Sequence, residues 1–310
     1  MGSPDFAVES LDKLIKSDFI NLKGVVTQPD RKRGRGQKLK PTPVKKLAQK
    51  NDIEVYQPSK ISTEIGVKKL NDWNPDLIIV VAYGQILSKE VLEVPDLGCV
   101  NLHASLLPKY RGAAPIHQAV INGDQKSGVT TMFMEEELDS GPMLLKAEVE
   151  ITAKDTAGSL HDKLATQGAD LLVETIKKLA NDEIKPKEQD HSQASYAPKL
   201  DKDDCEIDWQ ASAKAIWNKI RGLNPWPGAY TYYNGERFKL WQSKFVKDEA
   251  SASKVEAGTI IKLDENEGIL VQTGKGQLLL TEVQPPSRKK ISAADYIKGY
   301  EIEVGNKLGE

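Results

Sequence analysis

Cysteine is scarce in this sequence. The 310 residues include two, Cys99 and Cys205, far apart in the chain. Neither belongs to a CxxC pair, and no spacing of cysteine and histidine typical of a zinc site occurs. We therefore expect no metal centre, and two unpaired thiols fit a reducing compartment. A chain of this length buries a core large enough to fold without a disulfide or a metal.

Long hydrophobic runs are also missing. The longest one, Leu77 to Tyr83, is far shorter than the roughly 20 residues that a bilayer-spanning helix needs. Residues 1–6 contain no basic region followed by an apolar stretch, so they do not form a signal peptide. The sequence lacks a GxGxxG fingerprint, which disfavours a nicotinamide-dependent enzyme. We expect a cytoplasmic protein that does not bind membranes.

The overall charge is close to neutral. The formal net charge is −2 and the pI is near 6.2, which excludes a protein that is basic over its whole surface. The composition, with 39% hydrophobic and 28% charged residues, is typical of a globular protein. One segment departs from this balance, since residues 31–50 contain nine Lys or Arg and no Asp or Glu.

The first two-thirds of the chain alternate helix-like and strand-like segments. Helices are expected over residues 8–15, 44–51, 65–73, 113–122 and 157–181, and strands over 21–27, 54–56, 77–81, 99–102 and 130–134. This alternation predicts an α/β fold with a parallel-rich sheet and right-handed crossovers. A Gly-Ser-Pro turn that enters a helix normally follows a strand, yet Gly2 comes directly after Met1. We therefore expect the leading strand of the sheet to be missing.

The last third has a different pattern. Residues 185–204 are polar, contain two prolines and read as a linker. Beyond them a helix is expected over 212–221, and short strands over 229–233, 238–245, 258–263, 268–273 and 277–283. Asn234-Gly235 is a hairpin signal. We predict a domain over 1–184, a linker over 185–204 and a small β-barrel domain over 205–310.

Three polar residues follow predicted strands. Asn101 and His103 are two positions apart on one strand, so their side chains share a face, and Asp139 follows a later strand. An amide, an imidazole and a carboxylate suit acyl transfer to an amine. Asn101 would stabilise the developing oxyanion, His103 would move protons or donate to that oxyanion, and Asp139 would hold the imidazole. The alternative from spacing alone is a capping or hydrogen-bonding pair in a loop.

The motif around these residues is long. Residues 101–108 (Asn-Leu-His-Ala-Ser-Leu-Leu-Pro), followed by Arg111-Gly112 and by Leu138-Asp139-Ser140-Gly141, resemble the signature of the folate-dependent formyltransferases. The resemblance implies a Rossmann-like catalytic domain, 10-formyltetrahydrofolate as co-substrate and no metal. It implies that Asn101, His103 and Asp139 are catalytic. The residues it assigns to the folate site are Ser105, Leu106, Leu107 and Pro108, together with Tyr83, Gln85, Ile86 and Leu87.

Three further segments resemble the branch of this family that formylates methionyl-tRNA. They are residues 1–7, the basic stretch 27–44 and residues 221–229. The resemblance implies formyl transfer to initiator methionyl-tRNA for translation initiation, by a monomer with a C-terminal OB-like domain. It places Arg33, Arg35, Lys38 and Lys40 on the tRNA. A local basic patch on the OB-like domain is expected at Arg288, Lys289 and Lys290.

Two alternatives remain open from the sequence. The chain is another folate-dependent formyltransferase with a small amine acceptor, or an inactive homologue that binds tRNA. The basic stretch alone would also fit a solvated charge run. For Trp209, Trp217, Trp226 and Trp241 core packing is the expected role, more than stacking on bases. Packing is likewise expected for His117, surface exposure for His161, and a linker position for His191.

Overall fold

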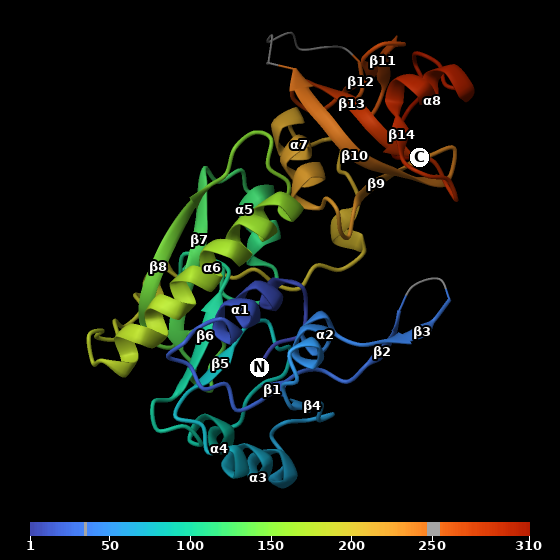
Figure 1. Cartoon of the computed structure of the whole chain (residues 1–310). Helices are drawn as coiled ribbons and strands as arrows, with labels where there is room; N and C mark the ends of the chain where they lie inside the picture. The colour runs from blue at the N-terminus through green and yellow to red at the C-terminus, as the bar shows by residue number, and fades with distance from the viewer. Residues whose placement is uncertain (34–35, 247–254) are drawn as a thin grey trace. The chain divides into compact units, whose positions relative to one another are not determined.

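The computed structural model describes residues 1–33, 36–246 and 255–310. These residues divide into two compact units (Figure 1). Unit 1 comprises residues 1–115, 126–150 and 161–197, and unit 2 comprises 116–125, 151–160 and 198–310. Within the described ranges, no helix is both long and apolar enough to cross a bilayer.

A mixed sheet forms the centre of unit 1. It has the order β5 (Ile78–Val80), β6 (Cys99–His103), β7 (Lys126–Phe133) and β8 (Met143–Glu150). β5 and β6 are parallel, whereas β6, β7 and β8 are antiparallel. β1 (Val25–Val26) and β4 (Val55–Tyr56) form a second parallel pair. The parallel half matches the predicted βα alternation, while β8 has no counterpart among the expected strands.

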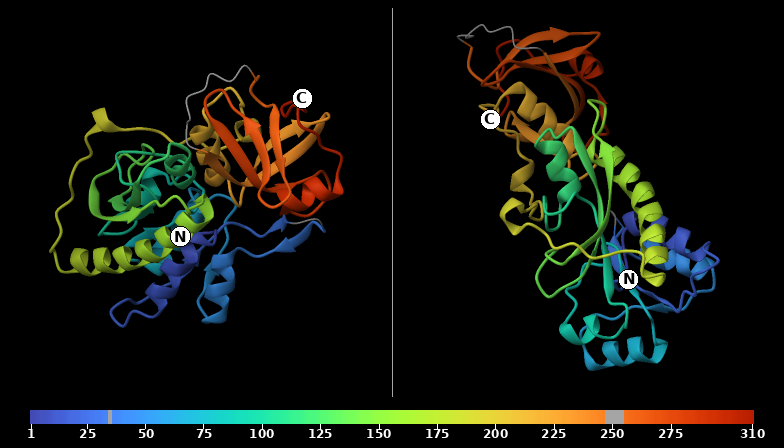
Figure 2. Two further views of the ribbon diagram at one scale, coloured as in Figure 1. Left: turned by 90° about the horizontal axis from the view of Figure 1, so that it is seen from above. Right: turned by 90° about the vertical axis from the view of Figure 1, so that its left-hand side faces the viewer.

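Helices pack around the strands of unit 1. They are α1 (Phe6–Ile15), α2 (Pro43–Lys50), α3 (Glu64–Trp73), α4 (Lys89–Leu92) and the long α6 (Ala157–Ala180), which can be followed in Figure 2. Their starts follow from local chemistry. The Thr42 hydroxyl accepts from the Lys45 N–H, with Pro43 in the first turn, and Thr63 caps the Gly66 N–H in the same way. Helices α1, α2, α3 and α6 begin within two residues of their predicted starts. No helix was predicted at the position of α4.

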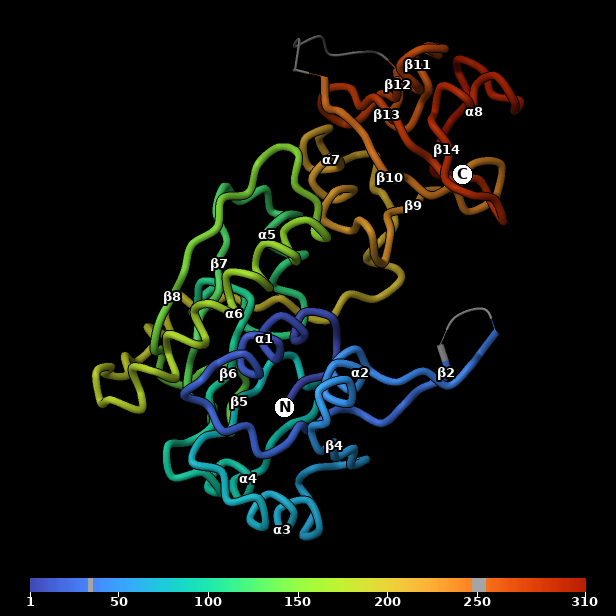
Figure 3. The backbone as a smooth tube through the Cα atoms, in the orientation of Figure 1, coloured from blue at the N-terminus to red at the C-terminus, as the bar shows by residue number. Residues whose placement is uncertain are grey.

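The first two residues lie between β1 and β5. Gly2 forms a parallel bridge with Val81, and its N–H donates to the Val26 carbonyl (3.0 Å). The Val81 N–H in turn donates to the Met1 carbonyl (2.9 Å). Figure 3 shows the N-terminus beside β5. Met1 and Gly2 therefore occupy the position of a central strand between β1 and β5.

Unit 2 is built on one antiparallel sheet. Its order is β11 (Ile260–Asp264), β12 (Gly268–Gln272), β13 (Gln277–Gln284), β10 (Glu236–Val246) and β9 (Ala229–Tyr233), with β14 (Ile291–Ser292) paired to β13. Its helices are α5 (Pro115–Ile121), α7 (Ala213–Gly222) and α8 (Ala293–Gly299). All five expected strands are present. The turn at Asn234-Gly235, with φ of 51° and 72°, joins β9 and β10 as predicted.

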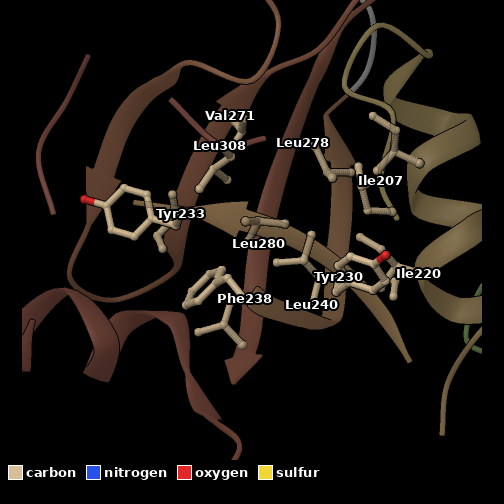
Figure 4. Packing of buried hydrophobic residues seen from close by; sticks show 14 of the residues in the cluster. Ile207, Ile220, Tyr230, Tyr233, Phe238, Leu240, Val271, Leu278, Leu280 and Leu308 are labelled. Atoms are coloured by element: carbon tan, nitrogen blue, oxygen red, sulfur yellow. The ribbon is translucent and has the colours of Figure 1, made fainter. Parts of the chain in front are cut away.

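The core of unit 2 lies against this sheet. Phe238, Leu240 and Leu280 point into it beside Ile220 of α7, as Figure 4 shows. All four side chains are buried. Alternation of buried and exposed positions along the strands puts these residues on one face. The sheet is thus an all-β platform backed by a helix.

The basic stretch is a hairpin in the structure. β2 (Arg31–Arg33) and β3 (Lys38–Lys40) pair antiparallel, with Arg31 opposite Lys40. The hairpin extends away from α2 and β4 in Figure 1. Lys38, Leu39 and Lys40 are exposed, so the pairing leaves a cationic ribbon open to solvent.

Candidate active site

The candidate site starts at the carboxyl end of β6. Val80 pairs with Asn101, so the segment that leaves β5 lies next to Asn101. Carboxyl ends of parallel strands meet at one edge of a sheet, where ligands of α/β proteins bind. Asn101 is half-buried and His103 is buried. Their two-residue spacing places both side chains on one face of β6.

The imidazole of His103 lies between two oxygen acceptors. Its Nε2 is 2.9 Å from the Tyr110 carbonyl, and its Nδ1 is 3.6 Å from Oδ2 of Asp139. A carbonyl only accepts, so Nε2 carries the proton in that hydrogen bond. The carboxylate of Asp139 then faces Nδ1. A proton on Nδ1 would face an anion, which makes this ring suited to holding positive charge during a reaction.

Asp139 is itself held by the backbone. Its Oδ2 accepts from the Gly112 N–H (2.8 Å), and the residue has a φ of 50°. Tyr110 has a φ of 60° and Gly112 a φ of 110°, so three residues around the histidine adopt a left-handed conformation. At Gly112 a Cβ would lie 2.8 Å from the Ala197 carbonyl oxygen, which leaves no room for a side chain. Such strain is retained where surrounding contacts fix a site.

A network of buried side chains fixes the segments at residues 110–112 and 139–141. Nε and Nη2 of Arg111 donate to Oε1 of Gln189 (3.2 and 2.8 Å), and the guanidinium is almost inaccessible. Nε2 of Gln189 donates to the carbonyls of Asp139 (2.9 Å) and Gly141 (2.8 Å). Nδ1 of His191 is 3.2 Å from Nη2 of Arg111. Gln189 therefore connects Arg111, which follows the 101–108 motif, to the backbone of Asp139.

Gln189 and His191 are neighbours of the candidate site that the sequence analysis did not find. Both lie in the segment predicted as a linker. Its polar composition carries no period, and its contacts with Arg111 span about 80 positions of the chain. Nothing in the sequence marks this glutamine. Its contacts with the 101–112 motif appear only in the folded structure.

Replacing Gln189 with methionine is expected to lower kcat about tenfold and stability by about 2 kcal/mol. The change leaves the buried guanidinium of Arg111 without its amide acceptor and frees the carbonyl of Asp139. Stopped-flow transfer rates and urea unfolding would measure the two effects.

A double substitution separates the two roles of Gln189. With Arg111→Met added, no unpaired guanidinium is buried, so much of the stability should return while kcat stays low. Full recovery of kcat in the double variant would contradict a role for this network in positioning Asp139.

The 105–108 loop is fixed by β7 and β8. Thr130 donates through its hydroxyl to the Ser105 carbonyl (2.7 Å) and accepts from the Leu107 N–H (3.2 Å). Nζ of Lys146 donates to the Leu107 carbonyl, and burial lowers the pKa of this lysine, with Lys187 adding to the effect. The Ser105 hydroxyl is buried and donates to the Lys109 carbonyl (2.6 Å). Ser105 thus shapes the loop from within, whereas Leu106 and Pro108 are half-buried at its surface.

The segment that follows β5 runs along the same edge. Tyr83 and Leu87 are buried in the hydrophobic cluster beneath it, and burial raises the pKa of Tyr83 well above its usual range. Oε1 of Gln85 accepts from the Ile61 N–H (2.8 Å), so this side chain fixes a neighbouring turn. Ile86 is 85% exposed. Of the four predicted folate residues here, Ile86 alone presents its side chain fully to solvent.

Two family models match this chain. Residues 1–176 match the family model described as formyl transferase, and residues 199–301 match formyl transferase, C-terminal domain. The chain belongs to the formyl transferase family.

Its curated relatives match over the whole chain. The methionyl-tRNA formyltransferase of Halothermothrix orenii is 50% identical over 100% of this chain and 98% of its own length. That of Clostridium novyi is 51% identical over 99% of this chain and 98% of its own. A solved structure of an N-formyltransferase from Helicobacter canadensis, in complex with folinic acid and dTDP-3-aminofucose, has a TM-score of 0.65. It is 19% identical and covers 90% of this chain and 96% of that one, so it supports the fold.

Three of the four predicted tRNA residues lie on β2 and β3, apart from the catalytic motif in sequence: Arg33, Lys38 and Lys40. Arg33 is opposite Lys38, and Lys40 ends β3. Lys38 and Lys40 are exposed. Arg35 lies outside the described residues.

Three of the four tryptophans discussed above pack in the core of unit 2, as expected for most of them. Trp209 and Trp241 are buried and Trp217 packs against the core of unit 2. Trp226 is 63% exposed. Nζ of Lys290 lies 3.4 Å from the centre of the Trp241 ring, so this member of the expected basic patch stacks on an aromatic face.

Proposed function

We propose that this formyltransferase moves the formyl group of 10-formyltetrahydrofolate to the α-amine of methionyl-initiator tRNA. The observation that carries the proposal is the ring of His103, held between the Tyr110 carbonyl and Asp139 beside Asn101. The near-50% identity to methionyl-tRNA formyltransferases over the whole chain supports this acceptor over a small amine.

The reaction requires the protein to stabilise an oxyanion, to move a proton and to balance the charge of the group that carries this proton. The neutral amine of the methionyl group attacks the formyl carbon, a C–N bond forms, and the carbonyl electron pair moves to oxygen. The amide N–H of Asn101 stabilises this oxyanion. When the intermediate collapses, the bond to the folate nitrogen breaks. The amine loses one proton and the folate nitrogen gains one, which His103 carries while Asp139 balances its charge.

The acceptor itself favours this chemistry. An ester next to the α-amine lowers the pKa of the amine below the value of about 8 for an ordinary α-amino group. A larger fraction is therefore neutral and nucleophilic near pH 7. No covalent enzyme intermediate is required, because the amine is the nucleophile.

In this proposal the tRNA meets two cationic surfaces. One is the basic stretch that comprises Arg33, Lys38 and Lys40 of β2 and β3, together with Arg35. The other is the exposed patch at residues 288–290 of the C-terminal domain, which we assign to 205–310 after a linker over 185–204. Lysine and arginine neutralise phosphates irrespective of base sequence. We also propose a cytoplasmic monomer that does not bind membranes.

The double charge reversal Lys38→Glu, Lys40→Glu is expected to raise KM for the tRNA at least about tenfold and to leave KM for the folate unchanged. Two phosphate contacts are lost and replaced by repulsion, so the salt dependence of binding should also flatten. Titrations at several salt concentrations would measure this.

A matched control is Lys68→Glu on α3, an exposed lysine paired with Asp72 (2.9 Å) and outside the hairpin. It should change neither KM. Equal losses in the control and in the hairpin variant would argue that net charge matters and that the hairpin has no specific role.

The function is tested by formyl transfer from 10-formyltetrahydrofolate to charged initiator methionyl-tRNA, beside a dTDP-linked amino sugar as the rival acceptor. Transfer to the tRNA alone is expected. Transfer to the sugar alone would identify a small-amine formyltransferase. No transfer by folded protein that still binds the tRNA would identify an inactive binding homologue.

A further inference from the structure

The register of the sheet in unit 1 places His103, Thr130 and Lys146 in one row. His103 of β6 is opposite Thr130 of β7, and Thr130 is opposite Lys146 of β8. These three neighbouring strands can be followed in Figure 1. Side chains that are directly opposite each other in antiparallel strands share one face of the sheet. The face that carries the candidate catalytic residue His103 therefore continues through Thr130 to Lys146, about 10 Å away at the usual spacing of strands.

The 105–108 loop packs on this face. Leu107 is buried in a cluster with Met132 and Met143. Met132 lies two residues after Thr130, so its side chain shares the face of Thr130, and Met143 of β8 is opposite Met132. The packing of Leu107 thus places the middle of the loop over β7 and β8, next to the two polar side chains that complete the row.

These two polar side chains hold the backbone of the loop. The buried hydroxyl of Thr130 donates to the Ser105 carbonyl (2.7 Å) and accepts from the Leu107 N–H (3.2 Å). Nζ of Lys146 donates to the Leu107 carbonyl. One hydroxyl can donate and accept at the same time, so a single row of the sheet bonds to three backbone groups of the loop.

The hydrogen bond of Lys146 is made at a position that is unfavourable for its charge. Loss of hydration lowers the pKa of this lysine, and the positive charge of Lys187 adds to the effect. Both causes act against the cation, whereas the Leu107 carbonyl accepts a hydrogen bond from it. Hydrogen bonds from a charged donor are stronger than neutral ones. The contact therefore adds a directional restraint to the packing of Leu107.

We infer that Thr130 and Lys146 are positioning residues for the folate, because they hold the backbone of the 105–108 loop in the conformation that borders this co-substrate. The inference rests on the proposed function, which assigns this loop to the folate site. Neither side chain needs to touch the reacting atoms. A loop that is fixed before the ligand binds loses little conformational freedom on binding, so removing these hydrogen bonds should weaken folate affinity more than the catalytic rate.

The test is the binding of folinic acid to the full chain, measured by isothermal titration calorimetry. Thr130→Val keeps the shape of the side chain and removes its hydroxyl, so Kd should rise about tenfold, and hydrogen exchange at the Leu107 amide should become about tenfold faster. Thr130→Ser keeps the hydroxyl, so its Kd should stay within about twofold of the wild-type value. Lys146→Met should raise Kd about fivefold.

Steady-state constants separate positioning from catalysis. In Thr130→Val and Lys146→Met, KM for 10-formyltetrahydrofolate should rise by the same factors as Kd, while kcat and KM for the tRNA stay within about threefold. A rise confined to KM for the tRNA would overturn the inference, because the loop would then border the acceptor.

The matched control is Thr131→Val. Thr131 is the next residue of β7 and is equally buried, but its hydroxyl lies on the other face of the sheet. There it accepts from the Leu145 N–H (3.1 Å) and lies 2.9 Å from the hydroxyl of Thr175 in α6. This variant should lose stability and keep the wild-type Kd for folinic acid.

Three further results would count against the inference. Equal weakening in Thr130→Val and Thr131→Val would trace the loss to general destabilisation, and a loss that Thr130→Ser does not restore would exclude the hydroxyl as its cause. Folinic acid binding that none of the substitutions changes would overturn this inference alone. Absence of binding by the wild type would overturn the proposed co-substrate, and this inference with it.

Discussion

Replacing His103 with alanine is expected to lower kcat for formyl transfer about 10³-fold, with little change in KM for either substrate. Proton transfer by a positioned side chain contributes roughly 10²–10⁴-fold, and His103 is the side chain that carries the proton in this reaction. The ring of His103 contacts other groups of the protein, the Tyr110 carbonyl and Asp139, so substrate binding should persist without it. Single-turnover rates with saturating substrates would measure the loss.

Two further variants define what the histidine does. Asp139→Asn keeps an oxygen for the Gly112 N–H but removes the negative charge near Nδ1, so kcat should fall about 10²-fold with an unchanged melting temperature. The matched control is His161→Ala, in α6, whose ring contacts Phe6 edge-on at 5.3 Å. It should leave kcat within twofold. If the His103→Ala enzyme kept a third of its activity, His103 would not take part in the reaction.

The fold was predictable where periodicity is strong. The apolar run at β5 and the alternating strands β9 to β13 are present as expected, because each buries one or both faces against a core. β8 was missed since its sequence, Met143–Glu150, interleaves charged residues at exposed edge positions. The β2–β3 hairpin was missed because a run of basic residues has no apolar face to reveal a strand.

The candidate site was predictable for a different reason. Asn101, His103 and Asp139 were found through a long motif, and the structure brings His103 and Asp139 within 3.6 Å. The support for that motif was not predictable. Gln189 contacts Arg111 across 78 positions of the chain, and Thr130 reaches the 105–108 loop from another strand. Such contacts depend on how the sheet assembles, which local sequence does not encode.

The chain is expected to lose about 3 kcal/mol of stability when the pH falls from 8.5 to 5.5, through the amine of Met1 alone. Burial lowers the pKa of this amine from about 8 to about 5 in the folded state, so between these values the unfolded chain binds the extra proton. Protons therefore favour unfolding in this window. The contribution is fully present above pH 8 and is lost as the pH falls toward 5, at about 1.4 kcal/mol per pKa unit.

Urea unfolding at both pH values would measure this loss, with an N-acetylated chain as the control. Acetylation converts the amine to an amide, so the acetylated chain should keep every other titration and lack this one. The difference between the two chains isolates Met1 from the carboxylates that also titrate near pH 5. An identical pH dependence in both would mean that the amine is hydrated in the folded state.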